Sequence, residues 1–198
     1  MRLFKFIFFI TILHIVNTNI IGQNYEIVLA VPNTVRIKGT SNISNFTLDY
    51  QNSLSEKKGI VLGKFQNNKA SISGANNIVL NVKSFTSSNK LITGDFYKML
   101  QADKYPNITI EMVQFIKNPD NKTNPYIMAI ITIAGVKRLE ILPINIKEKN
   151  NGQLLVSCLH KISLKNYKLT APKKMMGMIT VNDIVYINIE TTAIINNK

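Results

Sequence analysis

Polar and apolar residues alternate with a period of two over much of the chain. In residues 34–38, Val35 and Ile37 share one face, while residues 45–50 place Phe46, Leu48 and Tyr50 together. This period is typical of β-strands that bury one face. Similar alternation, or β-branched runs, predicts further strands at residues 25–31, 59–65, 77–85, 108–116, 126–134, 136–147, 153–164 and 184–194.

Turn-forming residues separate these segments. They are Asn67-Asn68, Ser73-Gly74, Asn118-Pro119-Asp120 and Asn150-Asn151-Gly152. Asn, Gly and Pro favour the backbone conformations that tight turns require. Pro32-Asn33 likewise predicts a turn that ends the first strand.

Two segments depart from the strand pattern. Residues 93–100 place Phe96, Met99 and Leu100 at helical spacing on one side, and Pro106 stops a helix from running into the next strand. Residues 171–178 begin with Ala-Pro, which suits the first turn of a second short helix.

Many short strands with one or two short helices indicate an all-β, antiparallel fold whose edges must be hidden. A closed barrel of about eight strands does this in a chain of this size. An outer-membrane barrel is the alternative, but its outer face would be a continuous apolar band with aromatic girdles. Many strands here carry Lys, Glu or Asn on one face, and the chain has no Trp, so the sequence favours a barrel in water.

The first residues have the order of a secretory signal peptide. Arg2 and Lys5 precede an apolar run to residue 16, and Gly22 offers a small residue for cleavage. A membrane anchor is the alternative, but the run is shorter than the ~20 apolar residues that a span needs. We therefore expect a signal peptide at 1–22, a single barrel domain at 23–198, and a periplasmic or secreted protein.

The charge distribution bears on partners. The formal net charge of +13 becomes +11 without Arg2 and Lys5, which would favour peripheral contact with an anionic membrane surface. Nucleic-acid binding calls for clustered Arg with aromatic residues, whereas Arg36 and Arg138 are the only arginines after the leader. No nucleic-acid partner is expected, and a homodimer stays open.

The residues offer no clear catalytic or metal site, and no cofactor is expected. Cys158 and His160 share a strand face about 7 Å apart, beyond hydrogen-bond reach; a buried thiol and a histidine near the rim are the plainer interpretation. Asp95 and Asp103 flank the first helix, where a helix cap and a turn are expected rather than an acid–base pair. A metal site needs three or four ligands, which the one His that follows the predicted leader, one Cys and scattered carboxylates do not supply.

Three motifs in this order resemble the YceI-like family, in its Bacteroidetes-type form. They are residues 35–42 (VRIKGTSN), residues 93–100 with 103–110 (TGDFYKML and DKYPNITI), and residues 133–138 (IAGVKR). The resemblance implies an exported, lipocalin-like barrel described as polyisoprenoid-binding. The chain departs from this subfamily at Ser44, Asn45 and Phe46, where it usually has His, Asp and Trp. It also departs at residues 166–169, where the family often has an Asp-Phe-Gly-like run.

The function expected from these observations is non-catalytic binding of an isoprenoid, quinone-like or other long-chain lipid inside the barrel. Met is flexible enough to fit an irregular apolar ligand. Plain core packing is the alternative for each candidate, and a structural or stress-related envelope protein with a packed barrel and a Lys-rich surface that binds anionic envelope components is the alternative function. The candidate ligand-binding residues are Phe46, Phe85, Phe96, Met99, Leu100, Phe115, Met175, Met176 and Met178.

Overall fold

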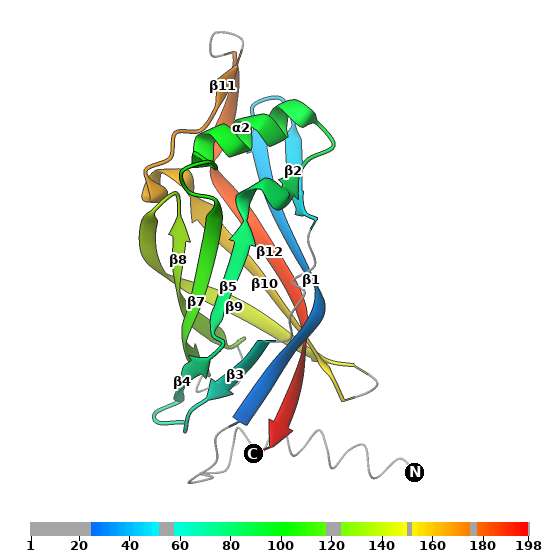
Figure 1. Cartoon of the computed structure of the whole chain (residues 1–198), viewed down its shortest axis with the longest axis vertical. Helices are drawn as coiled ribbons and strands as arrows, with labels where there is room; N and C mark the ends of the chain where they lie inside the picture. Colours follow the sequence, from blue (N-terminus) through cyan, green and yellow to red (C-terminus); the bar gives the residue numbers. More distant parts are fainter. Residues whose placement is uncertain (1–24, 52–57, 118–123, 150–151, 175–177, 198) are drawn as a thin grey trace.

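In the computed structural model, the wall of the molecule is one antiparallel sheet of twelve strands (Figure 1). The structure describes residues 25–51, 58–117, 124–149, 152–174 and 178–197. The predicted signal peptide at 1–22 lies outside these residues. The strands are β1 (Tyr25–Ser41), β2 (Asn45–Tyr50), β3 (Lys58–Leu62), β4 (Lys69–Gly74), β5 (Asn77–Asn81), β6 (Phe85–Thr86), β7 (Asn107–Ile116), β8 (Tyr126–Ile133), β9 (Val136–Glu148), β10 (Leu154–Ser163), β11 (Lys173–Lys174) and β12 (Ile179–Asn197).

The sheet closes on itself through its two longest strands. The ring runs β12-β10-β9-β8-β7-β4-β3-β1, and β1 then pairs with β12 from Tyr25↔Asn197 to Ser41↔Val181. Closure leaves no long unpaired edge on β1 or β12, which is the physical advantage of a barrel. The predicted antiparallel barrel of about eight strands is therefore confirmed.

Two strands change partners half-way along the barrel. β1 pairs with β3 through Tyr25–Leu29 and with β2 through Arg36–Thr40. β7 similarly pairs with β5 near its start and with β4 near its end. Between β5 and β6, a 3₁₀ turn (Val82–Ser84) continues the wall, because Val82 N–H donates to Pro106 O at 2.8 Å.

The predicted turn at Pro32-Asn33 is wrong, because β1 continues through it. Between Ala30 and Thr34, β1 advances four residues while β12 moves only from Thr192 to Glu190. Such a bulge tolerates proline, whose nitrogen cannot donate to the ladder. The bulge lies where β1 exchanges β3 for β2, so the signal interpreted as a turn marks a bend.

The first predicted helix is confirmed but begins earlier, as α2 (Lys90–Leu100). The Asn89 side chain caps it by accepting from Leu91 N–H at 2.9 Å. Asp95, expected at the cap, lies inside the helix. The second predicted helix at 171–178 is wrong in its described part, since Lys173–Lys174 forms β11, which pairs with β12.

Two further strand predictions need correction. The segment predicted as one strand at 77–85 is β5, the 3₁₀ turn and the start of β6. β4 was not predicted, because the correctly placed Asn67-Asn68 turn precedes it and Ser73-Gly74 was taken for a second turn. The Ser73-Gly74 prediction is wrong, since both residues pair with β3 as the end of β4. Asn67 and Asn68 have φ of 49° and 63°, which Asn tolerates better than most residues.

The barrel interior holds two apolar clusters. One end is filled by Ile60, Leu62, Ile72 and Met112, against which Phe115 packs. The larger cluster occupies the middle and the end that α2 covers (Figure 1). The two ends of one barrel therefore differ in how they are filled.

Two of the sequence motifs meet in space at the β8–β9 turn. Ala134 and Gly135 both have positive φ, 47° and 79°, as a two-residue hairpin turn requires. A Cβ on Gly135 would lie 2.8 Å from Cε1 of Tyr105, so the tyrosine ring packs directly on this glycine. This contact holds the loop that follows α2 against the β8–β9 hairpin.

We predict that Gly135→Ala lowers the free energy of unfolding more than Gly152→Ala. Both glycines have φ near +75° (79° and 74°), where an alanine costs about 1–2 kcal/mol, but nothing lies within 4 Å of a Cβ at Gly152. Gly135→Ala must also displace Tyr105, which adds about 1 kcal/mol or more. Urea denaturation of both variants measures the difference, and equal losses would contradict the Tyr105 contact.

Candidate ligand chamber

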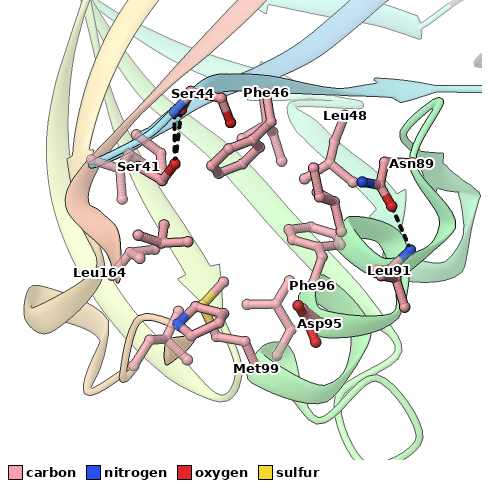
Figure 2. Close-up of a pocket in the computed structure, with 18 of the residues that line it drawn as sticks. Ser41, Ser44, Phe46, Leu48, Asn89, Leu91, Asp95, Phe96, Met99 and Leu164 are labelled. Atoms are coloured by element: carbon pink, nitrogen blue, oxygen red, sulfur yellow. Dashed lines mark hydrogen bonds between the residues drawn. The ribbon is translucent and has the colours of Figure 1, made fainter. Parts of the chain in front are cut away.

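A cavity of about 420 Å³ lies inside the barrel at the end that α2 covers. Most of its lining is aliphatic or aromatic, with four polar residues (Figure 2). It falls within the usual range for small-molecule sites, about 300–1,000 Å³. We call it the chamber; it is lined by Ile37, Ser41, Ile43, Ser44, Phe46, Leu48, Asn89, Leu91, Ile92, Asp95, Phe96, Met99, Leu100, Ile108, Ile133, Ile162, Leu164, Leu169, Pro172, Ile179, Val181, Val185 and Ile187.

Closely packed side chains limit the depth of the chamber. Val35 and Ile131 lie one inward-facing position further from α2 than Ile37 and Ile133 on the same strands. They are 2% and 1% exposed and do not line the chamber. The hollow therefore ends near the middle of the barrel.

A glycine makes room for an aromatic wall of the chamber. Gly39 and Phe46 face each other on β1 and β2. A Cβ on Gly39 would lie 2.2 Å from Cζ of Phe46, so the ring occupies the space above the glycine. Phe46 thus lines the chamber because its neighbour on β1 has no side chain.

One asparagine ties together two hairpins beside the chamber. Asn42 donates from Nδ2 to the Met178 carbonyl at 2.7 Å, and its Oδ1 accepts from Thr180 N–H at 3.0 Å. Asn42 N–H also donates to Thr180 O at 3.1 Å. The β1–β2 and β11–β12 hairpins are therefore held together where the chamber meets the outside.

The four polar lining residues come from the β1–β2 hairpin and from α2 with its N-cap residue. The Ser41 hydroxyl donates to Ser44 O at 3.0 Å, and the side-chain oxygen Oδ1 of Asn89 accepts from Leu91 N–H (Figure 2). Asp95 supplies the one carboxylate of the lining. Ile43 and Leu91 also line the chamber and are 65% and 72% exposed. The four polar residues lie on the same two segments and are therefore close to the mouth of the chamber.

Four predicted ligand-binding residues line the chamber together. Phe46 comes from β2, and Phe96, Met99 and Leu100 come from α2. Phe85 is 1% exposed and lies behind the lining, with its ring centroid 5.6 Å from that of Phe96. Their role in binding stays a prediction.

The remaining candidates lie elsewhere. Phe115 is at the opposite end of the barrel, in edge contact with Phe65 at 5.9 Å between centroids. Met178 is 65% exposed and does not line the chamber. Met175 and Met176 lie outside the described residues.

Sequence reasoning missed the aliphatic part of the lining. Ile37, Ile133, Ile162 and Ile187 come from four different strands. Each occupies an inward position of the two-residue period, so the alternation identifies them as interior. Only the tertiary structure separates residues around a hollow from residues in a packed core.

Cys158 is buried, as predicted, at 8% exposure. Burial raises the pKa of its thiol to about 11, because desolvation penalises the thiolate. His160 is 13% exposed by its side chain and pairs with Glu140 instead, at 3.2 Å between Nε2 and Oε2. The structure therefore gives no activated Cys–His pair.

Glu140 connects β9 to a 3₁₀ turn, Leu164–Tyr167, that follows β10. The Tyr167 hydroxyl donates to Glu140 Oε1 at 3.0 Å. Desolvation of this 1% exposed tyrosine raises its pKa, and the Glu140 charge adds to the effect. The neutral phenol therefore acts as a hydrogen-bond donor within the wall.

Asp103, the other flanking carboxylate, lies outside the chamber. It pairs with Lys83 at 2.6 Å, and its side chain is 92% exposed. The hydrogen bond and charge of Lys83 lower the pKa of this carboxyl group. Among the described residues, no three His, Cys, Asp or Glu side chains form a group that could hold a metal ion.

These features define a class of protein: a closed, lipocalin-like β-barrel with an apolar chamber under a helix. The chain belongs to the YceI-like family, because the family model for the YceI-like domain matches residues 34–193. No curated protein matches the chain in sequence. Within the described residues, no helix has the length and apolarity needed to cross a membrane.

Solved structures support the fold. Burkholderia cenocepacia BcnA superimposes with a TM-score of 0.61 at 15% identity, over 81% of this chain and 95% of that chain. A polyisoprenoid binding domain from Saccharophagus degradans, implicated in plant cell wall breakdown, gives 0.50 at 9% identity, over 84% and 97%. At these identities the likeness concerns the fold alone.

We predict that the Cys158 thiol does not react with an aromatic disulfide reagent at mildly alkaline pH while the protein is folded. The thiolate is the reactive species, and a folded pKa of about 11 leaves little of it. After denaturant is added, the Cys158 thiol should react stoichiometrically with the reagent. Fast labelling of the folded protein would contradict this account.

Because the pKa of the Cys158 thiol is raised in the folded protein, we also predict that this thiol lowers the free energy of unfolding as the pH rises from the unfolded pKa, about 8.5, toward 11.

Proposed function

We propose that this protein is an exported, non-catalytic binding protein that holds the chain of a lipid or isoprenoid in its chamber. The observation that carries the proposal is the apolar hollow at one end of a barrel whose other end is filled. An apolar chamber with a few polar groups near its mouth suits an amphiphile, whose tail lies inside and whose head stays near water.

The chamber volume sets the length of chain that is buried. At roughly 30 Å³ per heavy atom, the share of one molecule in liquid water, about 14 carbon atoms fill the chamber. At ~0.8 kcal/mol per methylene group, transfer of such a chain from water is worth about 11 kcal/mol before the costs of binding. A bilayer offers a similar gain, so the net preference is small and exchange is reversible.

A family neighbour supports an isoprenoid as the ligand. The Saccharophagus degradans domain that shares the fold is a polyisoprenoid binding domain. A polyisoprenoid of about 30 carbons would gain over 20 kcal/mol if fully buried, but the chamber takes only part of it. In this proposal, one end of the chain fills the chamber and the rest extends through the mouth.

Export and the absence of catalysis complete the proposal. The cationic, apolar and small-residue sequence at 1–22 supports secretion into the periplasm or beyond. The buried Cys158 and the His160–Glu140 pair give no nucleophile positioned at the chamber. None of these three residues lines the chamber.

The exterior of the mouth supports loading from an anionic membrane. Ile43, Leu91 and Met178 are exposed by 65%, 72% and 65%, and Asn42 joins two of the segments that carry them. Lys90 and Lys98 are exposed on α2, the helix that also carries Leu91. Apolar side chains flanked by lysines favour the surface of an anionic bilayer.

We predict that Ile133→Trp, which fills the chamber, weakens binding of a long-chain lipid probe by tenfold or more, because the indole takes the volume of the tail. The matched control is Ile141→Trp, since Ile141 is 58% exposed on the outer face of β9 and should leave affinity unchanged. Fluorescence titration with a neutral long-chain probe measures both. Mass spectrometry of organic extracts should also detect a co-purified lipid in the wild type and less of it in Ile133→Trp.

Equal affinities for the two variants would contradict binding in the chamber. Ligand-free wild type that also binds no probe would instead favour a packed, structural envelope protein. In that case salt-sensitive binding to anionic vesicles would persist without any dependence on the chamber.

We predict that the double variant Ile43→Asp, Leu91→Asp reduces binding to phosphatidylglycerol vesicles by tenfold or more, because it places two carboxylates against an anionic surface. Leu139→Asp is the control, since Leu139 is 58% exposed on the side wall. Vesicle co-sedimentation measures the effect. A loss as large in Leu139→Asp would contradict docking through the mouth.

A further inference from the structure

Strands β9 and β10 separate at the end of the barrel that holds the chamber. Within the described residues, their pairing stops at Ile144↔Cys158, and from Val136 to Pro143 β9 pairs with β8 alone. β10 continues against β12 as far as Ser163. The hydrogen-bonded wall therefore has a gap between these two strands.

The segment that follows β10 covers this gap. We call residues 164–169 the bridging segment; it begins with the 3₁₀ turn Leu164–Tyr167. Leu164 and Leu169 are 4% and 7% exposed and line the chamber, and Figure 2 shows Leu164 across the cavity from α2. Side chains of the bridging segment thus form the chamber wall where strand pairing is missing.

Two carboxylates hold the bridging segment in place. On the β12 side, Asp183 accepts from the Ser163 hydroxyl and from Lys165 N–H, the latter at 2.9 Å. On the β9 side, Glu140 accepts from the Tyr167 hydroxyl at 3.0 Å. Among the described residues, this is the hydrogen bond that joins the bridging segment to β9.

Glu140 is itself held by neighbouring side chains. Its Oε2 lies 3.2 Å from His160 Nε2 on β10, and Arg138 Nε lies 3.8 Å from its Oε1. The side chains of Glu140 and His160 are 19% and 13% exposed, so little water competes for these contacts. A hydrogen bond to a charged acceptor is stronger than one to a neutral acceptor, and loss of Glu140 would leave the hydroxyl of the 1% exposed Tyr167 without this partner.

We propose that Glu140 is a positioning residue of the chamber and sets how long a bound chain is retained. This inference rests on the proposed function and adds a determinant of ligand release. With Glu140 in place, the bridging segment keeps Leu164 and Leu169 against the ligand. Without it, the segment is free to move away from β9, the ligand loses apolar contacts with both leucines, and the chain leaves sooner.

The test measures the release rate of a neutral long-chain fluorescent probe. The purified protein is loaded with the probe and mixed with excess phosphatidylcholine vesicles, and stopped-flow fluorescence follows the loss of bound probe. We expect Glu140→Leu and Tyr167→Phe to release the probe about tenfold faster or more, the scale of one hydrogen bond to a charged group. Tyr167→Phe removes the donor hydroxyl and keeps the packing of the ring.

A conservative variant and a stability control accompany these variants. Glu140→Gln retains a side-chain oxygen that accepts from Tyr167, so its release rate should stay within about threefold of the wild type. Met112→Ala is the control, because Met112 is 5% exposed in the filled end of the barrel and does not line the chamber. It should lower the urea midpoint through the cavity it leaves, while its release rate stays within about threefold.

Two results would overturn this inference while leaving the proposed function intact. One is release at the wild-type rate from folded Glu140→Leu and Tyr167→Phe. The other is an acceleration in Met112→Ala as large as in these two variants, which would assign the effect to overall stability. If Glu140→Leu does not fold, Tyr167→Phe and Glu140→Gln still decide the matter. A wild type that binds no probe would instead refute the proposed function.

Discussion

The hydrogen-bonded pairing of β1 with β12 is the constraint on which the rest of the structure depends. It joins strands of 17 and 19 residues along nearly their whole length and closes the sheet. Closure provides ladder partners for the strands that would otherwise be edges, and it fixes an interior that an eight-stranded ring must either fill or leave for one small ligand. This barrel does both, since Met112 and its neighbours fill one end and the chamber occupies the other.

The chamber lies at the end of the barrel where β9 and β10 no longer pair, and short elements complete the wall there. The β9–β10 pairing ends at Ile144↔Cys158, while β10 continues against β12 to Ser163. The 3₁₀ turn after β10 then brings Tyr167 to Glu140 of β9, and Leu164 and Leu169 line the chamber. α2 lies across this end (Figure 1), capped at Asn89, and covers the hollow instead of filling it.

Local chemistry predicted most of the fold and only part of the site. The two-residue period identified most strands because each buries one face, and Phe96, Met99 and Leu100 were found because a helix repeats its apolar face. Pro32-Asn33 was misinterpreted because a bulge and a turn use the same residues. Asp95 was expected at a helix cap because the helix was predicted to begin at residue 93, whereas Asn89 caps it. The aliphatic lining was missed because a hollow depends on contacts between distant strands.

The most direct test of a hollow barrel end is an experimental electron-density map of the protein purified from cells without added lipid. The account predicts continuous density that begins between Ile133 and Ile162, passes Phe46 and reaches the mouth beside Asp95. Side chains of the lining that meet across the chamber and leave no room for an alkyl chain would contradict it.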